Sequence, residues 1–356
     1  MRHVIITGGC GFVGFNLARH LVEAGYRVTV FDNLVRRGSE INVPALLKFG
    51  IPFVHGDIRN PEDFSLLSRD ADCLIECSAQ PSVVSGYLNP FYDFTTNVTG
   101  VMNCLEFCRV RGIGMIFLSS SRVYPASKIN SLPTIERPTR WDWNPAADRQ
   151  TLPRGFDPEF GISAQFDVDG PTKTIYGASK ASADFFCQEY ADAFNLPIIV
   201  NRCGVVAGEG QFGVIGQGWL TFWVMSCLLE RPVTYFGHKG KQVRDVIFIK
   251  DLCTLVRTQL ERLGLLSGRV WNVGGARQNS LSLVEATALV ERLTNKKMRV
   301  NYSEEPRKGD MIIYISNNME VSRDLDWSPS ISVETGTERI VRWIRDNQNA
   351  LLQSGL

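Results

Sequence analysis

A tyrosine and a lysine lie four residues apart in the middle of the chain. Tyr176 and Lys180 belong to a segment, 176–194, whose apolar spacing predicts a helix, so both side chains occupy one face of it. A free tyrosine has a pKa of about 10 and is a poor base at neutral pH, but a neighbouring ammonium group favours the phenolate. A fall of about two or three pKa units, each worth about 1.4 kcal/mol, brings such a base near the operating pH. The pair therefore indicates removal of a proton from an alcohol while a hydride leaves the same carbon.

Three serines follow a predicted strand upstream of this pair. The strand covers 115–118 and leads into Ser119, Ser120 and Ser121, and we interpret Ser120 as the group that steadies the substrate oxygen. Taken alone, a lysine one turn after a tyrosine is more often an ordinary pair on a helix surface. The strand-end serine, together with a glycine turn near the N-terminus, makes the catalytic interpretation the stronger one.

The glycine turn has glycines at every third residue, Gly8, Gly11 and Gly14. The apolar run 3–6 predicts a buried strand before them, and the spacing of 15–24 predicts a helix that the next glycine ends. Without Cβ atoms the chain can turn sharply and approach a pyrophosphate that lies on the helix N-terminus. A tight turn without a ligand is the alternative, and the flanking strand and helix favour a dinucleotide site.

An acidic residue ends the second predicted strand, 26–31. Asp32 lies 18 residues beyond Gly14, at the distance where a carboxylate binds the ribose hydroxyls of an adenosine. A carboxylate repels a 2′-phosphate, so we predict NAD rather than NADP as the cofactor. Arg36 and Arg37 close by weaken that choice.

Predicted strands and helices alternate up to about residue 200. Further strands are predicted at 51–54, Cys73–Glu76, 115–118 and 197–201, and further helices at 91–111, 176–194 and 281–293. The alternation predicts an α/β fold with a doubly wound parallel sheet of the Rossmann type and a smaller C-terminal α/β lobe for the substrate. We expect residues 1–202 plus 241–270 to form the dinucleotide domain, 203–240 plus 271–330 the lobe, and 331–356 a C-terminal helix.

A long proline-rich connection, residues 125–171, separates the serines from the tyrosine. A connection of this length in a compact domain is usually a lid, a binding loop or a disordered segment. Trp141 and Trp143 argue against simple disorder. We therefore predict a loop that shapes the substrate pocket.

The composition excludes several classes of partner. The chain has 356 residues, of which 44% are hydrophobic, and a net charge of +1, so we expect neither nucleic acid nor a membrane as a partner. Nine cysteines without a CxxC pair predict a reducing, cytoplasmic environment. Four scattered histidines show no ligand spacing, so no metal is predicted. No stretch is apolar enough to span a bilayer.

Together these residues resemble the extended short-chain dehydrogenases/reductases that act on nucleotide sugars, and the resemblance runs nearly from end to end. It implies that Ser120, Tyr176 and Lys180 form the catalytic triad. It implies that the NAD site contains Gly8, Gly11, Phe12, Val13, Gly14, Asp32, Asn33, Arg37, Asp57, Ile58, Ala79, Gln80, Asn97, Tyr176, Lys180 and Arg202. It implies that the nucleotide-sugar site contains Ser121, Arg122, Gly204, Gln217, Arg244, Arg307 and Asp310. An arginine fork also suits a diphosphate on physical grounds, whereas a solvated surface charge is the alternative for each arginine.

Details narrow the choice within that family. The 4,6-dehydratases carry an Asp-Glu pair directly after the catalytic Ser or Thr, where this chain has Ser121 and Arg122. The UDP-glucose 4-epimerases usually have Arg-Tyr-Phe-Asn where this chain has Arg-Cys-Gly-Val at 202–205, so their substrate-binding asparagine is missing. The segments that instead resemble the 2-epimerases of CDP-linked sugars are 217–219, 240–246 and 279–285.

The resemblance implies an isomerase that oxidises a sugar hydroxyl, at C2 by preference, and returns the hydride to the opposite face. The alternatives are a 4-epimerase, a nucleotide-sugar dehydrogenase or reductase, and an NAD-binding regulatory protein without activity. In relatives the helices that correspond to 91–111 and 176–194 form the dimer's four-helix bundle, so we expect a homodimer or homotetramer. The base of the nucleotide, the sugar and the inverted carbon stay open.

Overall fold

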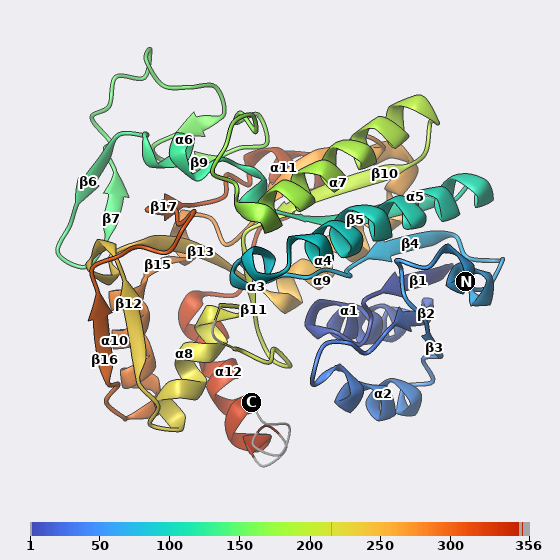
Figure 1. Cartoon of the computed structure of the whole chain (residues 1–356), viewed down its shortest axis with the longest axis horizontal. Coiled ribbons are helices and arrows are strands. Elements are labelled where there is room, and N and C mark those ends of the chain that lie inside the picture. The colour runs from blue at the N-terminus through green and yellow to red at the C-terminus, as the bar shows by residue number, and fades with distance from the viewer. Residues whose placement is uncertain (1, 215, 349–350, 352–356) are drawn as a thin grey trace. The chain divides into compact units, whose positions relative to one another are not determined.

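The computed structural model describes residues 2–214, 216–348 and 351, which divide into two compact units (Figure 1). Unit 1 comprises Met1–Ser120, Ile175–Arg202 and Leu252–Val270, and unit 2 comprises Ser121–Thr174, Cys203–Asp251 and Trp271–Leu356. The division that we expected from the sequence differs at two segments, 121–174 and 241–251, which belong to unit 2. Backbone pairing explains the difference, because Trp141 in the first segment donates from its N–H to the carbonyl of Lys241 in the second, at 2.9 Å.

Within the described residues, seven strands form one sheet in the order β14-β10-β5-β4-β1-β2-β3. Their bounds are β1 (His3–Thr7), β2 (Arg27–Asp32), β3 (Phe53–His55), β4 (Cys73–Glu76), β5 (Gly114–Ser120), β10 (Ile198–Cys203) and β14 (Val270–Val273). The five strands from β3 to β5 pair in parallel. Strand β1 is central and the chain returns from the β3 edge to β4, which creates the switch point of a doubly wound sheet. The predicted α/β Rossmann fold is confirmed.

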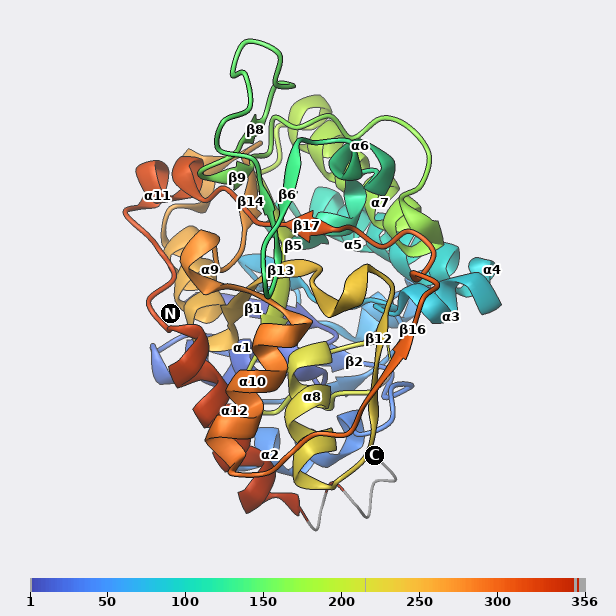
Figure 2. The ribbon, with the colours of Figure 1, turned by 90° about the vertical axis from the view of Figure 1, so that its left-hand side faces the viewer.

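Helices cover both faces of this sheet. Figures 1 and 2 show α5 (Gly100–Arg111) and α7 (Thr174–Ala193) side by side on one face, and α1 (Phe12–Glu23) on the other. On α7 the small side chains of Ala183 and Cys187 recur every fourth residue and are buried, so this helix lies close against the strands. The remaining helices of this unit are α2 (Ser39–Lys48), α3 (Val83–Leu88), α4 (Pro90–Phe94) and α9 (Ile249–Glu261).

The segment predicted as one helix over 91–111 is interrupted. It contains α4, a π-helical turn, η2 (Thr95–Thr99), and then α5. Three of the five residues of η2 are threonines and a fourth is valine, and β-branched side chains have weak helix propensity. The turn buries Asn97, whose amide is fully hydrogen-bonded inside unit 1. The long-range bonds of that amide explain why helical spacing alone missed the interruption.

Unit 2 has its own small sheets and its own core. Strand β13 (Val243–Phe248) pairs with β11 (Val205–Ala207), β15 (Ser280–Ser282) and β17 (Ile313–Tyr314), and β12 (Val233–Phe236) pairs with β16 (Val300–Ser303). The helices α8 (Trp219–Leu228), α10 (Leu283–Thr294) and α12 (Val333–Asp346) pack around a second apolar cluster (Figure 2), and α11 (Met319–Leu325) also belongs to this unit. Helix α10 begins two residues after the predicted start because Ser282 and Glu285 form a capping box there. Of the predicted C-terminal helix, residues 349–350 and 352–356 lie outside the described residues. Across the described chain, no helix has both the length and the apolar character needed to cross a membrane.

The long connection 125–171 has secondary structure of its own. It contains α6 (Ala126–Asn130), an antiparallel pair of β6 (Thr134–Glu136) with β7 (Trp141–Trp143), and a second pair of β8 (Phe156–Asp157) with β9 (Gly161–Ile162). Trp143 is buried and its ring meets that of Phe156 edge-on, with centroids 5.1 Å apart. The two tryptophans thus mark an ordered segment, as predicted.

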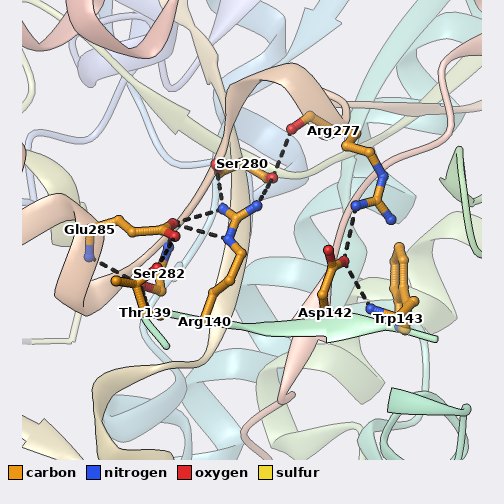
Figure 3. Close-up of polar contacts among 8 residues, drawn as sticks. All are labelled: Thr139, Arg140, Asp142, Trp143, Arg277, Ser280, Ser282 and Glu285. Carbon is orange, nitrogen blue, oxygen red and sulfur yellow. Dashed lines mark hydrogen bonds and ion pairs between the residues drawn. The ribbon is translucent and has the colours of Figure 1, made fainter. Parts of the chain in front are cut away.

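Two arginines anchor this segment to the rest of unit 2, as Figure 3 shows. Arg140 donates from Nε to Glu285 at 3.1 Å and from Nη2 to the carbonyl of Ser280 at 2.7 Å. Arg277 donates to Asp142 at 2.9 Å from the other side. Because Glu285 also caps α10, the anchor fixes β7 to the start of that helix.

Replacing Arg140 by alanine should loosen the segment without unfolding the protein. The change removes bonds that are largely shielded from water, so we expect a loss of about 1 kcal/mol in the free energy of unfolding and faster cleavage between 137 and 160 in limited proteolysis. Arg149→Ala is the matched control, because Arg149 lies in the same segment but is 66% exposed and pairs only at the surface. Equal cleavage rates in the two variants would contradict the anchoring role.

Candidate active site

Lys180 carries a charge inside the apolar layer of unit 1. Tyr176 is the third residue of α7, and Lys180 follows one turn later on the same helix. The lysine is only 2% exposed, and its Nζ lies 4.2 Å from the centroid of the Phe117 ring on β5. An ammonium over an aromatic face gains a cation–π attraction, which partly replaces the water it has lost. The helix therefore presents a desolvated positive charge one turn from the phenol.

A buried ion pair fixes α7 against the sheet next to these residues. Asp184, one turn after Lys180, accepts hydrogen bonds from Arg202 of β10 at 2.9 and 3.0 Å and from the hydroxyl of Ser119 of β5 at 2.6 Å. Asp184 and Arg202 are 0% and 4% exposed. Ser119 directly precedes Ser120, the last residue of β5. The pair thus holds the helix that carries Tyr176 and Lys180 to the strand that carries Ser120.

Asn97 provides a second tie to α7. Its Oδ1 accepts from the N–H of Gln80 at 3.0 Å, and its Nδ2 donates to Ser179 at 2.9 Å. The side chain of Gln80 is occupied as well, since it bonds to Ser82 and, at 2.5 Å, to Asp93. These contacts explain why Asn97 and Gln80 are buried, and they shape the loop after β4.

The glycine turn leaves no room for side chains. Gly8 has a φ of 62°, which favours glycine, and a Cβ on Gly14 would lie 2.4 Å from the carbonyl oxygen of Gly8. Gly11 precedes α1 and offers no side chain to cap its N–H groups. An open, positively polarised helix end over a side-chain-free turn fits a pyrophosphate. Phe12 and Val13 begin the helix and are half-buried.

One acid, Asp32, is the last residue of β2, and another, Asp57, follows β3. Asp32 accepts the N–H of Cys10 at 2.9 Å and the N–H of Leu34 at 2.8 Å; burial raises the pKa of Asp32, which these bonds oppose. Burial alone would also raise the pKa of Asp57, but hydrogen bonds from Arg59 and Asn33 lower it to about 2. The carboxylate of Asp32 is thus held beside the glycine turn, and that of Asp57 is held by Asn33, the residue that follows Asp32.

Several residues predicted to bind the cofactor have structural partners in unit 1. Arg202 is occupied by Asp184, Gln80 by Asp93 and Ser82, and the buried side chain of Ile58 packs where Gly100 leaves space. Arg37 is exposed and Ala79 is half-buried. Their role in binding the cofactor stays a prediction. Any contact with the cofactor has to be compatible with the contacts that these side chains already make in unit 1.

Three arginines gather around one carboxylate in unit 2. Arg244 donates to Asp310 at 2.5 Å, and Arg122 donates to the carbonyl of Gly309 at 2.9 Å and lies 3.9 Å from Asp310. Burial lowers the pKa of Arg244 to about 10, although Asp310 opposes the shift. The guanidinium of Arg307 lies over the ring of Phe236 at 4.5 Å, and burial lowers the pKa of Arg307, which the attraction of Asp310 opposes. One carboxylate does not balance three guanidinium groups, so the cluster has surplus positive charge suited to a diphosphate.

The other predicted substrate residues lie elsewhere in unit 2. Gly204 faces a buried acid, because a Cβ there would lie 3.0 Å from Oδ1 of Asp245, whose pKa burial raises to about 6. Gln217 pairs its backbone with Val214. Ser121 begins a single 3₁₀ turn, η3 (Ser121–Val123). Within the described residues no group of three or more His, Cys, Asp or Glu side chains is arranged to hold a metal ion.

Asp184 and Glu76 are buried acids of unit 1 that the sequence analysis did not single out. Asp184 lies four residues after Lys180, a spacing that placed it on the same helix face. Glu76 ends an otherwise apolar strand, β4, and a charged residue at the end of a buried strand is itself a signal. Both could have been noticed from residue type and position.

The fold and these residues define a class of protein that comparison with known proteins also identifies. Residues 4–146 and 157–274 match the model of the NAD-dependent epimerase/dehydratase family, so the chain belongs to that family. A CDP-paratose 2-epimerase of Salmonella typhi is 33% identical over 354 residues, which cover 96% of this chain and 98% of that protein. A UDP-glucuronate 4-epimerase of Thermodesulfobacterium geofontis is 25% identical and covers 98% of this chain, with 97% of its own length matched.

A solved structure supports the same assignment. The UDP-glucose 4-epimerase of Thermus thermophilus, in complex with NAD, is 25% identical and superposes with a TM-score of 0.74, covering 96% of this chain and 99% of that one. The predicted family, the NAD cofactor and the expectation of an enzyme of the isomerase class are confirmed.

Breaking the buried ion pair that holds α7 should lower the stability of the protein strongly. Asp184→Asn keeps the shape of the side chain but removes the negative charge that faces the buried Arg202 guanidinium, so we expect the free energy of unfolding to fall by about 3–5 kcal/mol. Denaturant titration measures it. Asp192→Asn, an exposed acid on the same helix, is the control and should change stability by less than about 0.5 kcal/mol. Similar effects of both substitutions would show that the buried pair does not fix α7.

Proposed function

We propose that the chain is a nucleotide-sugar epimerase that inverts C2 of a CDP-linked sugar. The observation that carries the proposal is the buried Lys180 charge one turn from Tyr176, on a helix tied to the strand of Ser120. Similarity to a CDP-paratose 2-epimerase along nearly the whole chain supports the choice of substrate. The segments 217–219, 240–246 and 279–285 carry the same resemblance in the sequence.

In this proposal the residues of unit 1 perform the proton chemistry. Tyr176, as phenolate, removes the proton from the sugar hydroxyl, while the charge of Lys180 stabilises the phenolate and the hydroxyl of Ser120 holds the substrate oxygen. Bound NAD supplies the hydride acceptor for the oxidation and the donor for the reduction, so there is no net redox change. The keto-sugar then rotates in the pocket and presents its other face to the returning hydride. Tyr176 gives its proton back to the oxygen on the inverted carbon.

The remaining predicted residues bind the two nucleotides. The side-chain-free turn at Gly8, Gly11 and Gly14 would hold the pyrophosphate of NAD, and Asp32 and Asp57 the adenosine part. In unit 2, Arg122, Arg244 and Arg307 would hold the diphosphate of the sugar nucleotide, with Asp310 fixing two of them. Ser121, Gly204 and Gln217 are proposed to contact the sugar or the base.

The second candidate is a 4-epimerase, which similarity to UDP-sugar 4-epimerases favours. A 4,6-dehydratase is the weaker choice, because Ser121 and Arg122 replace the two carboxylates that an elimination of water needs. The two epimerases use the same proton and hydride chemistry, so they differ only in which carbon faces the base.

We also propose a homodimer formed through α5 and α7, as in the expected four-helix bundle. Large apolar side chains remain exposed on these helices and beside them, among them Val110 of α5, Phe185 of α7 and Phe194 directly after α7, at 73%, 47% and 47%. Exposed apolar side chains on neighbouring helices are typical of a subunit interface.

Tyr176→Phe should abolish most turnover and leave the cofactor bound. The phenyl ring keeps the packing of α7 but has no proton to exchange, so we expect the rate to fall at least about a hundredfold. Activity on the CDP-sugar and NAD content of the purified variant are measured together. A near-normal rate would overturn the catalytic assignment, and loss of NAD would show that the change is not confined to the proton step.

Product analysis decides which carbon is inverted. Purified protein is incubated in heavy water with a panel of CDP-, UDP-, GDP- and dTDP-sugars, and the isomers are identified by NMR. We expect inversion at C2 of a CDP-sugar without accumulation of NADH. Inversion at C4 supports the second candidate instead, and NADH formed in proportion to product identifies a dehydrogenase.

A further inference from the structure

Glu76 is a buried acid that the proposed chemistry does not use. It is the last residue of β4, it is 0% exposed, and its neighbours in the sheet are Thr7 of β1 and Phe117 of β5. Within the part of the chain that the structure describes, neither of its carboxylate oxygens accepts a hydrogen bond of normal geometry. A carboxylate in such surroundings is costly unless a positive charge lies near it.

Among the described residues, Lys180 is the positively charged group that acts most on Glu76. Lys180 of α7, whose Nζ lies over the Phe117 ring, exerts the chief attraction on the carboxylate. Two thiols, Cys187 of α7 and Cys104 of α5, also face it. The backbone N–H and hydroxyl of Ser78 and the hydroxyl of Thr7 also favour the carboxylate. Phe117 links the two charged residues, because it pairs with Glu76 in the sheet and its ring lies under Nζ of Lys180.

We propose that Glu76 is a positioning residue for the reaction, because its carboxyl group sets how much of the Lys180 charge acts on Tyr176. The inference rests on the proposed function of Tyr176 and Lys180. It gives a role to a charged residue that the apolar layer would otherwise exclude. Only a proton moves: the carboxyl group of Glu76 releases it as the pH rises and no other bond changes.

The electrostatic consequence has a definite sign. Burial raises the pKa of Glu76 to about 7, against the attraction of Lys180, so its charge changes within the working pH range. When Glu76 is neutral, the ammonium acts unopposed and the phenolate of Tyr176 forms at lower pH. When Glu76 is ionised, it offsets part of that charge, and the phenolate requires a higher pH.

The test is the pH dependence of turnover in Glu76→Gln. The amide keeps the shape of the side chain and stays neutral, so the part of the kcat profile above about pH 7, where the wild-type carboxyl is ionised, should shift to lower pH by about one unit. A merely structural role would lower kcat without moving that part of the profile. Asp93→Asn is the matched control: Asp93 is equally buried in unit 1, one of its carboxylate oxygens also has no partner in the described chain, and Lys180 is not among the groups acting on it. The pH profile of kcat in Asp93→Asn should have the same midpoints as that of the wild type.

A second measurement does not depend on turnover. Glu76 has a raised pKa in the folded protein, so the folded state loses stability relative to the unfolded chain as the pH rises from 4.5 to about 7. The melting temperature of Glu76→Gln should therefore rise relative to that of the wild type as the pH increases across that window. In a Lys180→Met background the gain at pH 8 should be larger, since the carboxylate has lost its partner.

The outcomes separate the two proposals. If the wild-type protein shows no epimerase turnover, the proposed function is contradicted. The melting experiment then remains as the test of the coupling between Glu76 and Lys180. Turnover with an unshifted pH profile in Glu76→Gln overturns the inference and leaves the proposed function intact. Equal gains in melting temperature with and without Lys180 also overturn it, because they show that the two groups are not coupled.

Discussion

The account depends on one constraint, which is an ammonium group held out of water beside a phenol. Lys180 is almost fully buried, its Nζ lies over the ring of Phe117, and it attracts the carboxylate of Glu76. Burying a charge is unfavourable unless the structure around it is rigid and supplies attraction. In the proposed mechanism the same lack of water strengthens the effect of that charge on Tyr176, because screening is weak in an apolar layer.

The rest of unit 1 can be understood from this requirement. Helix α7 has to stay in register with β5, and the Asp184–Arg202 pair and the Ser119 hydroxyl hold it there. Asn97 adds a second tie through Ser179, at the price of an irregular π-helical turn. The glycine turn at the switch point of the sheet brings the dinucleotide corner to the same domain. A positioned base and a positioned cofactor are the two things that an epimerase of this family needs.

Local patterns were enough to predict most elements of unit 1. Apolar runs located β1, β4 and β10 within one or two residues, because a buried parallel strand has little freedom in composition. Helix α7 was predicted nearly from end to end for the same kind of reason. The interruption of 91–111 was missed because it depends on bonds of Asn97 to residues 17 and 82 positions away. The assignment of 121–174 to unit 2 likewise follows from pairing with distant backbone, which no local pattern reveals.

In the candidate site, too, some features could be predicted from the sequence and others depend on contacts between distant residues. Residue type and spacing were enough to predict a catalytic role for Ser120, Tyr176 and Lys180, since their chemistry is visible in single side chains. The use of Arg202 and Gln80 as partners of Asp184 and Asp93 could not be foreseen, because it depends on which strands and helices meet. The arginine cluster around Asp310 was expected from resemblance, and the structure adds how its charges are shared.

The central claim, that a buried ammonium makes Tyr176 a base, is tested most directly by titrating that phenol. Protein labelled with ¹³C at the tyrosine ζ-carbon is followed by NMR across the pH range, and the Tyr176 signal is assigned from the phenylalanine variant. The account predicts a midpoint well below the ordinary value of about 10, and a return towards that value in Lys180→Met. A Tyr176 that titrates at or above about 10 in the wild type would contradict it.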